Sequence, residues 1–325
     1  WATCILIFII LIGSFFIDFK FENTKNYLAF LSITLIPMYV FELMKIQFRL
    51  QHKNKLFALT EVVFFSILTL TILILSYYFK EKGYAIALVL TPILSVLFFV
   101  RKIKADLVFK EKLSIINREF WKYGFFASLS NVATQLLFAI DILLIGLLLN
   151  DPEMVTNYKY VSLIPLSLLF LPRAFINTDF VVFTENIYQK KYIVKYIKSY
   201  LLLFSLLSIG FCLFFGLFAD TILSLFDVTF IQYKTSFIIL VFGVSGILIF
   251  RGLFGNLLSS IGKAHVNFYI TSMALLFNVV SNYYLISKYG IKGAAITSAL
   301  LMWATGIVSA FVFWKLYNNH FLNRK

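Results

Sequence analysis

Ten long apolar runs, separated by short polar connections, dominate the pattern of hydrophobic and polar positions along the chain. A helix needs about 20 apolar residues to cross the roughly 30 Å hydrocarbon core of a bilayer, whereas the strands of a membrane barrel are shorter and alternate. The pattern therefore predicts an all-α integral membrane protein, a polytopic bundle of about ten spans. The expected spans are residues 2–17, 27–44, 56–79, 84–100, 123–149, 155–177, 199–218, 235–256, 266–286 and 293–314.

The composition agrees with this pattern and excludes a soluble chain. Of the 325 residues, 61% are hydrophobic and 14% are charged, and the mean hydropathy is +0.90. The two cysteines, Cys4 and Cys212, each lie inside an apolar run, so they do not indicate a disulfide framework. The net charge of +14 does not indicate a nucleic-acid partner, because the basic residues lie between the apolar runs and form no single patch.

Lys and Arg residues gather in alternate connections, as they do in the cytoplasmic loops of membrane proteins. At the second, fourth, sixth, eighth and tenth expected span ends and the connections after them there are 4, 7, 5, 2 and 3 Lys or Arg residues, 21 together, whereas the alternate connections hold one or two lysines each, 8 together. A wrong number of spans would scramble this alternation. The charge pattern therefore predicts that both ends of the chain are cytoplasmic.

The chain contains an internal repeat at a gap-free offset of 210 residues. The offset pairs Lys53 with Lys263, residues 82–83 with 292–293, residues 85–86 with 295–296, and Leu90 with Leu300. It covers an even number of spans, so both copies point the same way across the membrane. Such parallel repeats are typical of transporters whose halves meet at a central cleft.

Residues 276–295, LFNVVSNYYLISKYGIKGAA, resemble a signature of polysaccharide flippases, members of the multidrug/oligosaccharidyl-lipid/polysaccharide exporter superfamily. Residues 256–263, 118–124 and 141–146 are similar to further motifs of these proteins. The resemblance implies two pseudo-symmetric six-helix lobes around a central cavity and twelve or more helices in the intact protein. Residues 1–118 would be four spans of an N-terminally truncated N-terminal lobe, and residues 119–325 the six-span C-terminal lobe.

The resemblance also implies a function. Such a protein flips undecaprenyl-pyrophosphate-linked oligosaccharide from the cytoplasmic to the outer leaflet of the bacterial inner membrane by alternating access, for O-antigen, lipopolysaccharide or capsule synthesis. Its partners would be this lipid-linked substrate, membrane lipids, and the polymerase and chain-length machinery. The polar, anionic head needs a hydrated cleft with cations for the pyrophosphate and neutral polar groups for the sugars.

The apolar run 123–149 is the best candidate for a wall of this cleft. At 100° per residue its polar and small positions fall within about 140°. They are Gly124, Ser128, Asn131, Thr134, Gln135 and Asp141. Asp141 is ionisable within the membrane, which favours ion coupling or pairing with a cation, although a structural hydrogen bond between helices is an open alternative.

Several other polar residues within the spans are candidates for the pathway. Arg251 lies within a span rich in glycine, and its bidentate donor suits pyrophosphate, with snorkelling to the headgroups as the alternative. Arg173 follows Pro172 at a span end, where it could line the cavity or anchor the interface. Glu61 is a secondary ion-coupling candidate that could instead pair with the basic loop. Asn278 and Asn282, one turn apart, could bond sugar hydroxyls or neighbouring helices.

Signatures of other classes are weak. The three histidines lack metal-ligand spacing and there is no phosphate-cradling Gly-Lys-Ser/Thr loop, so we expect no metal site, no cofactor and no enzymatic activity. A cation-coupled multidrug exporter of the same superfamily is the nearest alternative, and it would favour a more acidic cleft. A membrane glycosyltransferase or polysaccharide polymerase would need a sizeable extramembrane loop, and no connection is that long.

Overall fold

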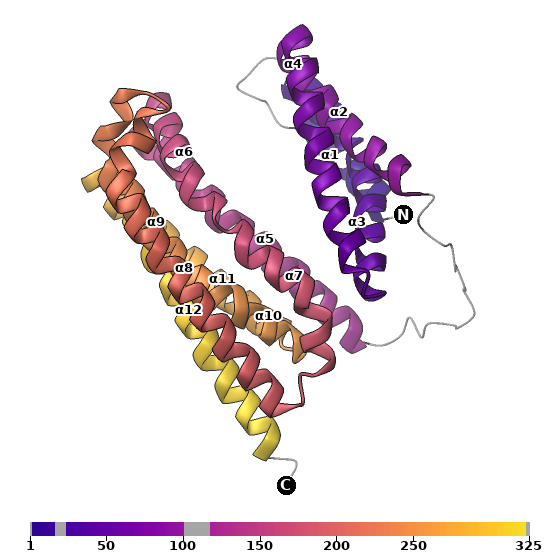
Figure 1. Cartoon of the computed structure of the whole chain (residues 1–325). Helices are drawn as coiled ribbons and strands as arrows, with labels where there is room; N and C mark the ends of the chain where they lie inside the picture. The colour runs from indigo at the N-terminus through magenta and orange to yellow at the C-terminus, as the bar shows by residue number, and fades with distance from the viewer. Residues whose placement is uncertain (1, 17–23, 101–117, 323–325) are drawn as a thin grey trace. The chain divides into compact units, whose positions relative to one another are not determined.

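The computed structural model describes residues 2–16, 24–100 and 118–322, and this part of the chain is built from helices. It forms two compact units, residues 1–113 and 114–325 (Figure 1). Eight of the described helical segments are long and apolar enough to cross a membrane, and Thr3–Ser14 is a shorter apolar helix. The chain is therefore a multi-pass membrane protein.

The first unit contains α1 (Ala2–Phe16), α2 (Thr24–Ser32), α3 (Leu35–Leu50) and α4 (Asn54–Phe99). Its core is aromatic, because Phe48 and Phe99 meet edge to face and Phe41 stacks on Phe64 with ring centroids 4.9 Å apart. The backbone of α4 leaves helical geometry at Lys80 (φ 50°, ψ −126°). Beyond this residue α4 folds back on itself, since a hydrogen bond of 3.1 Å joins the hydroxyls of Thr71 and Thr91, which a straight helix would hold about 30 Å apart.

The fold of α4 corrects the expected number of separate helical segments, although the reversal expected between the two runs is present. The runs 56–79 and 84–100 were expected to be separate helices, but both lie in the single helical segment α4. Nine apolar helical segments therefore stand in the described residues where ten were expected. The difference arises because one residue with left-handed φ reverses the chain, so no loop interrupts the helical hydrogen bonding for more than a turn.

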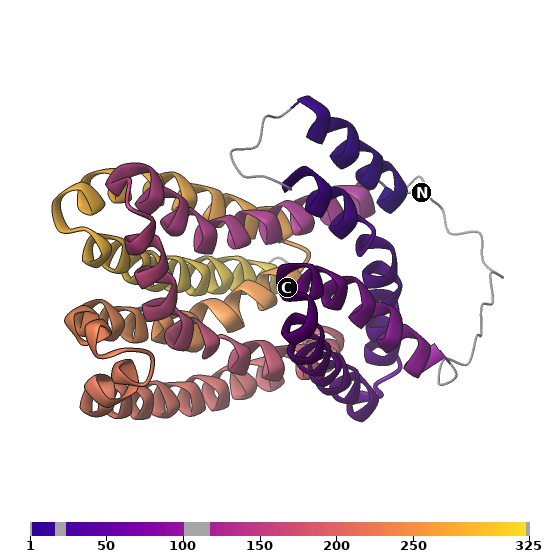
Figure 2. The same cartoon turned by 90° about the horizontal axis from the view of Figure 1, so that it is seen from above.

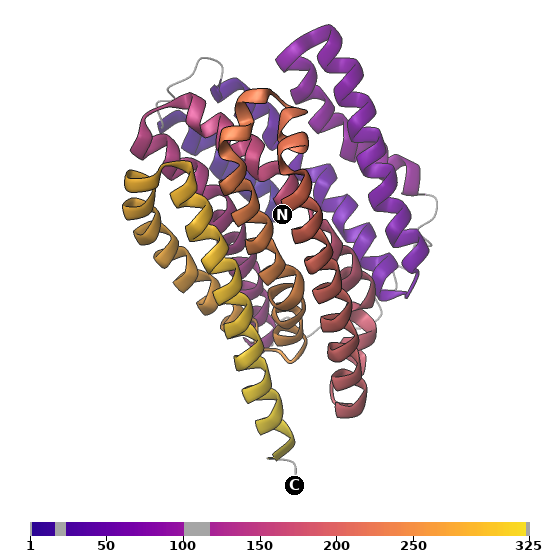
Figure 3. The same cartoon turned by 60° about the vertical axis from the view of Figure 1, so that its left-hand side comes forward.

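The second unit begins with α5, which is followed by a short capped connection. Asp151 accepts a hydrogen bond of 2.8 Å from the backbone N–H of Glu153, and Pro152 occupies the first position of α6. The segments in order are α5 (Arg118–Leu149), α6 (Pro152–Ser167), α7 (Phe170–Glu185), α8 (Lys190–Ser224), η2 (Val228–Tyr233), α9 (Lys234–Gly246), η3 (Ile247–Arg251), α10 (Gly252–Ser260), α11 (Ala264–Tyr289) and α12 (Ile291–Leu322). The helices α11 and α12 pack against each other, α5 packs on α11, and α9 packs on α12 (Figures 2 and 3).

The sequence repeat coincides with a repeated backbone turn. Gly290 (φ 57°, ψ −138°) stands 210 residues after Lys80 and has almost the same conformation. Three residues later in each copy a glycine touches the preceding helix, because a Cβ on Gly83 or Gly293 would lie 1.9 or 2.0 Å from the carbonyl oxygen of Leu75 or Leu285. The Lys-Gly pairs of the repeat therefore mark the same tight reversal between two helices in each unit.

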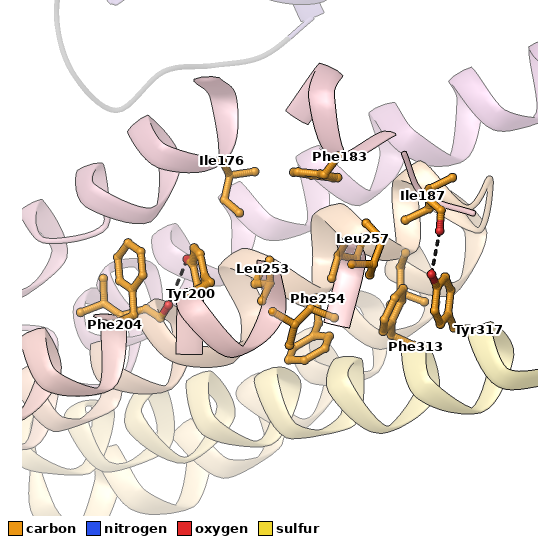
Figure 4. Close-up of a cluster of buried hydrophobic side chains, with 14 of the residues drawn as sticks. Ile176, Phe183, Ile187, Tyr200, Phe204, Leu253, Phe254, Leu257, Phe313 and Tyr317 are labelled. Atoms are coloured by element: carbon orange, nitrogen blue, oxygen red, sulfur yellow. Dashed lines mark hydrogen bonds between the residues drawn. The ribbon is translucent and has the colours of Figure 1, made fainter. Parts of the chain in front are cut away.

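An aromatic and aliphatic core holds α7, α8, α10 and α12 together (Figure 4). Two tyrosines in this core use their hydroxyls to satisfy backbone carbonyls. Tyr200 donates to the carbonyl of Leu248 at 3.1 Å, and Tyr317 donates to that of Ile187 at 2.7 Å. These bonds fix α8 to η3 and α12 to the end of α7 and so provide the frame for the polar residues described next.

Candidate functional site

Three helices of the second unit carry narrow polar stripes that face one another. Each stripe uses spacings of four and seven residues, which bring side chains to one side of a helix. The stripes are Ser130, Thr134 and Asp141 on α5; Asn267, Thr271, Asn278 and Asn282 on α11; and Ser298, Thr305 and Ser309 on α12. They meet in two clusters, one around Asp141 and one around Arg251.

Asp141 lies at the centre of the first cluster, and its residue is only 3% exposed. Its Oδ1 accepts hydrogen bonds from the amides of Asn278 at 3.0 Å and Asn282 at 2.7 Å. Its Oδ2 accepts from the hydroxyl of Tyr158 on α6 at 3.0 Å and from the hydroxyl of Ser298. One carboxylate thus joins α5, α6, α11 and α12.

All four donors to Asp141 are neutral. No ion pair involves Asp141 among the described residues, so its charge is compensated by dipoles alone. Next to it, Oδ1 of Asn282 is buried without a hydrogen-bond partner. A buried acceptor without a donor is costly, and oxygen atoms of this kind are ligands for small hard cations. The cluster therefore has the chemistry to hold a proton or a monovalent cation.

Arg251 is the centre of the second cluster and is half-buried at the end of η3. Its Nη1 donates to Oδ1 of Asn267 at 2.9 Å and to Oγ of Ser309 at 2.6 Å, and its Nη2 lies 3.3 Å from Oγ1 of Thr271. These acceptors are neutral, and no carboxylate pairs with Arg251 in the described chain. Arg251 is therefore an uncompensated positive charge in an apolar setting.

Glycines bring the backbones around Arg251 close together. A Cβ on Gly246 would lie 2.8 Å from Cα of Trp303, and one on Gly306 would lie 2.9 Å from the carbonyl oxygen of Gly246. This contact brings α12 against η3, which is a single π-helical stretch. A π-helical turn is wider than an α-helical one and often marks a functional position. It places Arg251 where α11 and α12 can both reach its guanidinium.

A cavity of about 50 Å³ lies between the two clusters. Its polar lining comes from Arg251 and Thr271 on one side and Asn278 and Ser298 on the other. Two further hydroxyls, of Thr134 and Thr305, and five apolar side chains complete the lining: Leu137, Phe138, Ile247, Leu301 and Met302. The arrangement combines a cation, a carboxylate cluster and a small, mostly apolar cavity with polar groups in its wall, all within the C-terminal unit.

The structure brings some predicted site residues together and separates others. Asp141, Asn278 and Asn282 meet in one cluster, and Arg251 contributes to the cavity beside it. Asn131 and Gln135 are exposed on α5, because the 140° sector drawn from the sequence spans both the inner and the outer side of the helix. The role of these residues in a pathway stays a prediction.

Arg173 and Glu61 lie outside both clusters. Arg173 is exposed on α7, next to the buried Pro172. In the first unit, Lys45 Nζ lies 2.6 Å from Oε1 of Glu61 and 2.9 Å from Oε1 of Glu42. Glu61 therefore takes part in an ion pair between α3 and α4, and its role in ion coupling stays a prediction.

Sequence reasoning missed the hydroxyl and amide partners of Arg251 and the hydroxyl donors of Asp141. The signal that could have found them is the spacing of polar residues on α11 and α12, where the stripes fall within about 60° and 40° at 100° per residue. On α11 it starts at Asn267 and on α12 it ends at Ser309. A serine or threonine in an apolar run attracts little attention alone, but three in one narrow stripe do.

Known membrane proteins are similar to this chain in sequence or in fold. No family model matches the chain. The Uncharacterized membrane protein MJ1068 of Methanocaldococcus jannaschii is 24% identical over 234 residues, which are 70% of this chain and 45% of the relative. The chain thus spans less than half the length of the curated relative it matches.

Solved structures of transporters share the fold. An outward-facing multidrug resistance MATE family transporter of the MOP superfamily has a TM-score of 0.69 at 14% identity, covering 98% of this chain and 76% of its own. The lipid II flippase MurJ in an inward closed conformation has a TM-score of 0.67 at 17% identity, covering 99% and 74%. The chain has the fold of MOP-superfamily transporters, the superfamily that the sequence motifs resemble.

Proposed function

We propose that this protein is a flippase that moves lipid-linked oligosaccharide pyrophosphate across the bacterial inner membrane for surface polysaccharide synthesis. The observation that carries the proposal is Arg251, a half-buried guanidinium whose bonded partners in the described chain are all neutral. A desolvated arginine without a carboxylate favours an anionic ligand, and its planar fork matches the oxygens of a phosphate. The MurJ-like fold supports a lipid-linked substrate.

The hydrogen bonds around Arg251 fit a charge that is held ready for a ligand. Asn267, Ser309 and Thr271 fix the guanidinium between α11 and α12 but do not neutralise it. A positioned, unneutralised cation loses little side-chain entropy when an anion arrives. The cavity of about 50 Å³ admits a phosphate oxygen and a few waters at most, so the rest of the head group would lie outside it.

Asp141 would couple this transport to an ion gradient. In an apolar interior a carboxylate with four neutral donors can exchange its counter-charge, because no fixed Lys or Arg occupies that role. The unpartnered Oδ1 of Asn282 would then serve as a further oxygen ligand, or accept the proton of a protonated carboxyl, once the amide rotates to turn this oxygen toward Asp141 in place of its NH2 group.

A cation-coupled multidrug exporter is the second candidate function. The MATE fold and the carboxylate cluster favour it, because a buried acidic residue can exchange a cationic drug for an ion. Asp141 is almost fully covered by its four donors, however, which leaves Arg251 as the charge on the cavity wall. An anionic substrate therefore agrees better with the cavity than a cationic one.

Complementation tests the proposal. The gene is expressed in bacteria that lack their O-antigen flippase, over a panel of glycan backgrounds, and surface polysaccharide is scored on a gel. Restoration in at least one background is the expected result, with Arg251→Ala abolishing it and Arg251→Lys retaining part. Arg118→Ala is the matched control, because it removes an exposed arginine at the start of α5 that makes no hydrogen bond to either cluster in the described residues.

The opposite result is equally clear. A well-expressed, membrane-inserted protein that restores no glycan but raises resistance to cationic drugs would replace the flippase by the multidrug exporter. Wild-type export by both Arg251→Ala and Arg251→Lys would remove Arg251 from the substrate path.

A further inference from the structure

The start of α5 and the turn between α10 and α11 enclose a further pocket, of about 300 Å³. It lies within the second unit and shares no lining residue with the cavity beside Arg251. Its charged and polar lining comes from Glu119, Lys122, Lys263 and His265, and the rest from Tyr123, Phe126, Gly262 and Ala264. A pocket of this volume has room for a small charged head group as well as water.

Two features hold the walls of this pocket in place. The chain between α10 and α11 turns at Gly262, whose φ of 76° favours glycine, and the N–H of Lys263 donates to the carbonyl of Leu258 at 2.9 Å. The hydroxyl of Tyr123 donates to the carbonyl of Ser259 at 3.2 Å and so ties α5 to the end of α10. The two lysines of the pocket therefore extend from two fixed segments into the same space.

The chemistry of the lining favours an anion. Lys122 and Lys263 are exposed, and Glu119 is the acidic residue among the described lining residues, so two positive charges and one negative charge leave a net charge of +1. His265 is half-buried in the wall, where a ring N–H can donate to an oxygen. Ammonium and imidazole groups are donors that suit the oxygens of a phosphate group.

The surroundings of the pocket are those of the membrane interface. The ring of Phe126 lies 6.1 Å from the ring of His265 and 6.1 Å from that of Tyr269, and the side chains of Tyr269, Trp121 and Phe125 are exposed. Exposed aromatic side chains are enriched where head groups meet hydrocarbon. Further along the two helices, exposed apolar residues continue at helical spacings: Val132, Leu136 and Leu143 on α5, and Met273, Leu276 and Val280 on α11. A ligand of this pocket would therefore have a charged head and apolar chains.

We propose that this pocket binds the phosphate head group of an anionic glycerophospholipid, whose acyl chains lie on the exposed apolar residues of α5 and α11. The charge pattern of the sequence predicts that this end of the helices lies in the cytoplasmic leaflet, whose surface is negative. Basic pockets between membrane helices on that side bind phospholipid head groups. This inference does not depend on the proposed function, because it concerns a lipid of the surrounding membrane and not the transported substrate.

The experiment uses the purified protein in a neutral detergent, and native mass spectrometry measures the dissociation constant of the first bound phosphatidylglycerol. Phosphatidylcholine with the same acyl chains is the comparison lipid, because its head group has no net charge. We expect the wild type to bind phosphatidylglycerol more tightly than phosphatidylcholine. A lysine beside an anionic lipid contributes about fivefold in affinity, so Lys122→Gln combined with Lys263→Gln should weaken phosphatidylglycerol binding about 25-fold and leave phosphatidylcholine binding unchanged.

The matched control combines Lys195→Gln with Lys198→Gln. These two lysines are exposed near the start of α8, do not line the pocket, and are predicted by the charge pattern to lie on the same side of the membrane. The control should bind phosphatidylglycerol like the wild type. The proposal is overturned if the pocket variant binds phosphatidylglycerol like the wild type. It is also overturned if the control loses as much affinity, because the attraction would then be a general effect of surface charge.

Two measurements on the wild type complete the test. Inorganic phosphate at millimolar concentration should leave the bound phosphatidylglycerol in place, because it lacks the acyl chains. Displacement of the lipid would overturn the proposal in favour of a soluble phosphate ligand. A photoreactive phosphatidylglycerol should label residues 119–126 or 262–269, and labelling confined to other segments would overturn the proposal even if the pocket variant does not fold.

Discussion

Replacing Gly293 by alanine should destabilise the second unit, whereas the same change at Gly210 should not. Gly293 lies in the first turn of α12, directly after the reversal at Gly290. A Cβ there would meet the carbonyl carbon and oxygen of Leu285 at 2.3 and 2.0 Å. Gly210, within α8, has no atom within 4 Å of the position of a Cβ.

The expected magnitude follows from these distances. Ordinary van der Waals contact begins at 3.4 Å, so α11 and α12 would have to separate by more than 1 Å. The clashing atoms belong to the backbone, so no change of rotamer relieves the contact. Overpacking typically costs about 1–3 kcal/mol, and a backbone clash belongs at the upper end, about 3 kcal/mol. Gly210→Ala should instead stabilise by up to about 1 kcal/mol, because alanine favours helix over glycine.

Thermal unfolding of the purified protein, followed by fluorescence-detected size-exclusion chromatography, measures both changes. A unit of this size loses roughly 2–4 °C in Tm per kcal/mol, so Gly293→Ala should melt about 10 °C lower. Gly83→Ala should behave in the same way in the first unit, since its Cβ would lie 1.9 Å from the carbonyl oxygen of Leu75. A Gly293→Ala protein that melts with Gly210→Ala would refute the reasoning.

Further substitutions test the charged groups. Asp141→Asn should reduce transport at least tenfold at unchanged protein level, because it removes the ion-coupling group. Asp220→Asn is the control and should leave transport unchanged, because Asp220 forms an exposed ion pair with Lys234. Normal transport rates in Asp141→Asn at every pH would exclude coupling through this residue. Lys45→Met should lower the free energy of unfolding by about 1 kcal/mol. It removes the partly solvated ammonium group that pairs with both Glu42 and Glu61. Thermal unfolding checks this, and a variant as stable as the wild type would mean that the ion pairs do not hold α3 to α4.

The tight turns are a feature of the fold that the local sequence predicts. A Lys-Gly pair recurs at an offset of 210 residues, and the structure repeats the same reversal and the same glycine contact there. The repeat is visible in the sequence because both turns need a glycine where the chain contacts the preceding helix. The apolar runs 56–79 and 84–100 predict a break where Lys80 reverses the chain, but hydropathy does not report that one residue makes this reversal within a single helical segment.

The polar stripes are a feature of the fold that the local sequence predicts only in part. Periodicity identified Asp141 as inward-facing, but it also included Asn131 and Gln135, which are exposed. A sector of 140° is wider than the contact between two packed helices, and at 100° per residue Asn131 and Gln135 lie about 80° and 120° from Asp141, so they can face a different side of the helix. The narrower set of Ser130, Thr134 and Asp141 is defined by the packing of α5 against α11 and α12.

By itself, the sequence determined that this is a multi-pass helical membrane protein with a repeated unit, because apolar run length and the need to satisfy every backbone hydrogen bond in lipid leave few alternatives. Its motifs pointed to the superfamily whose fold the structure shares. Only the tertiary structure decided which groups bond Asp141 and Arg251. Asn278 and Ser298 stand 137 and 157 residues from Asp141 along the chain, and helix packing alone brings them together. Local pattern cannot encode such a contact, because it depends on the rotation of each helix about its axis and on the glycines that let the helices approach.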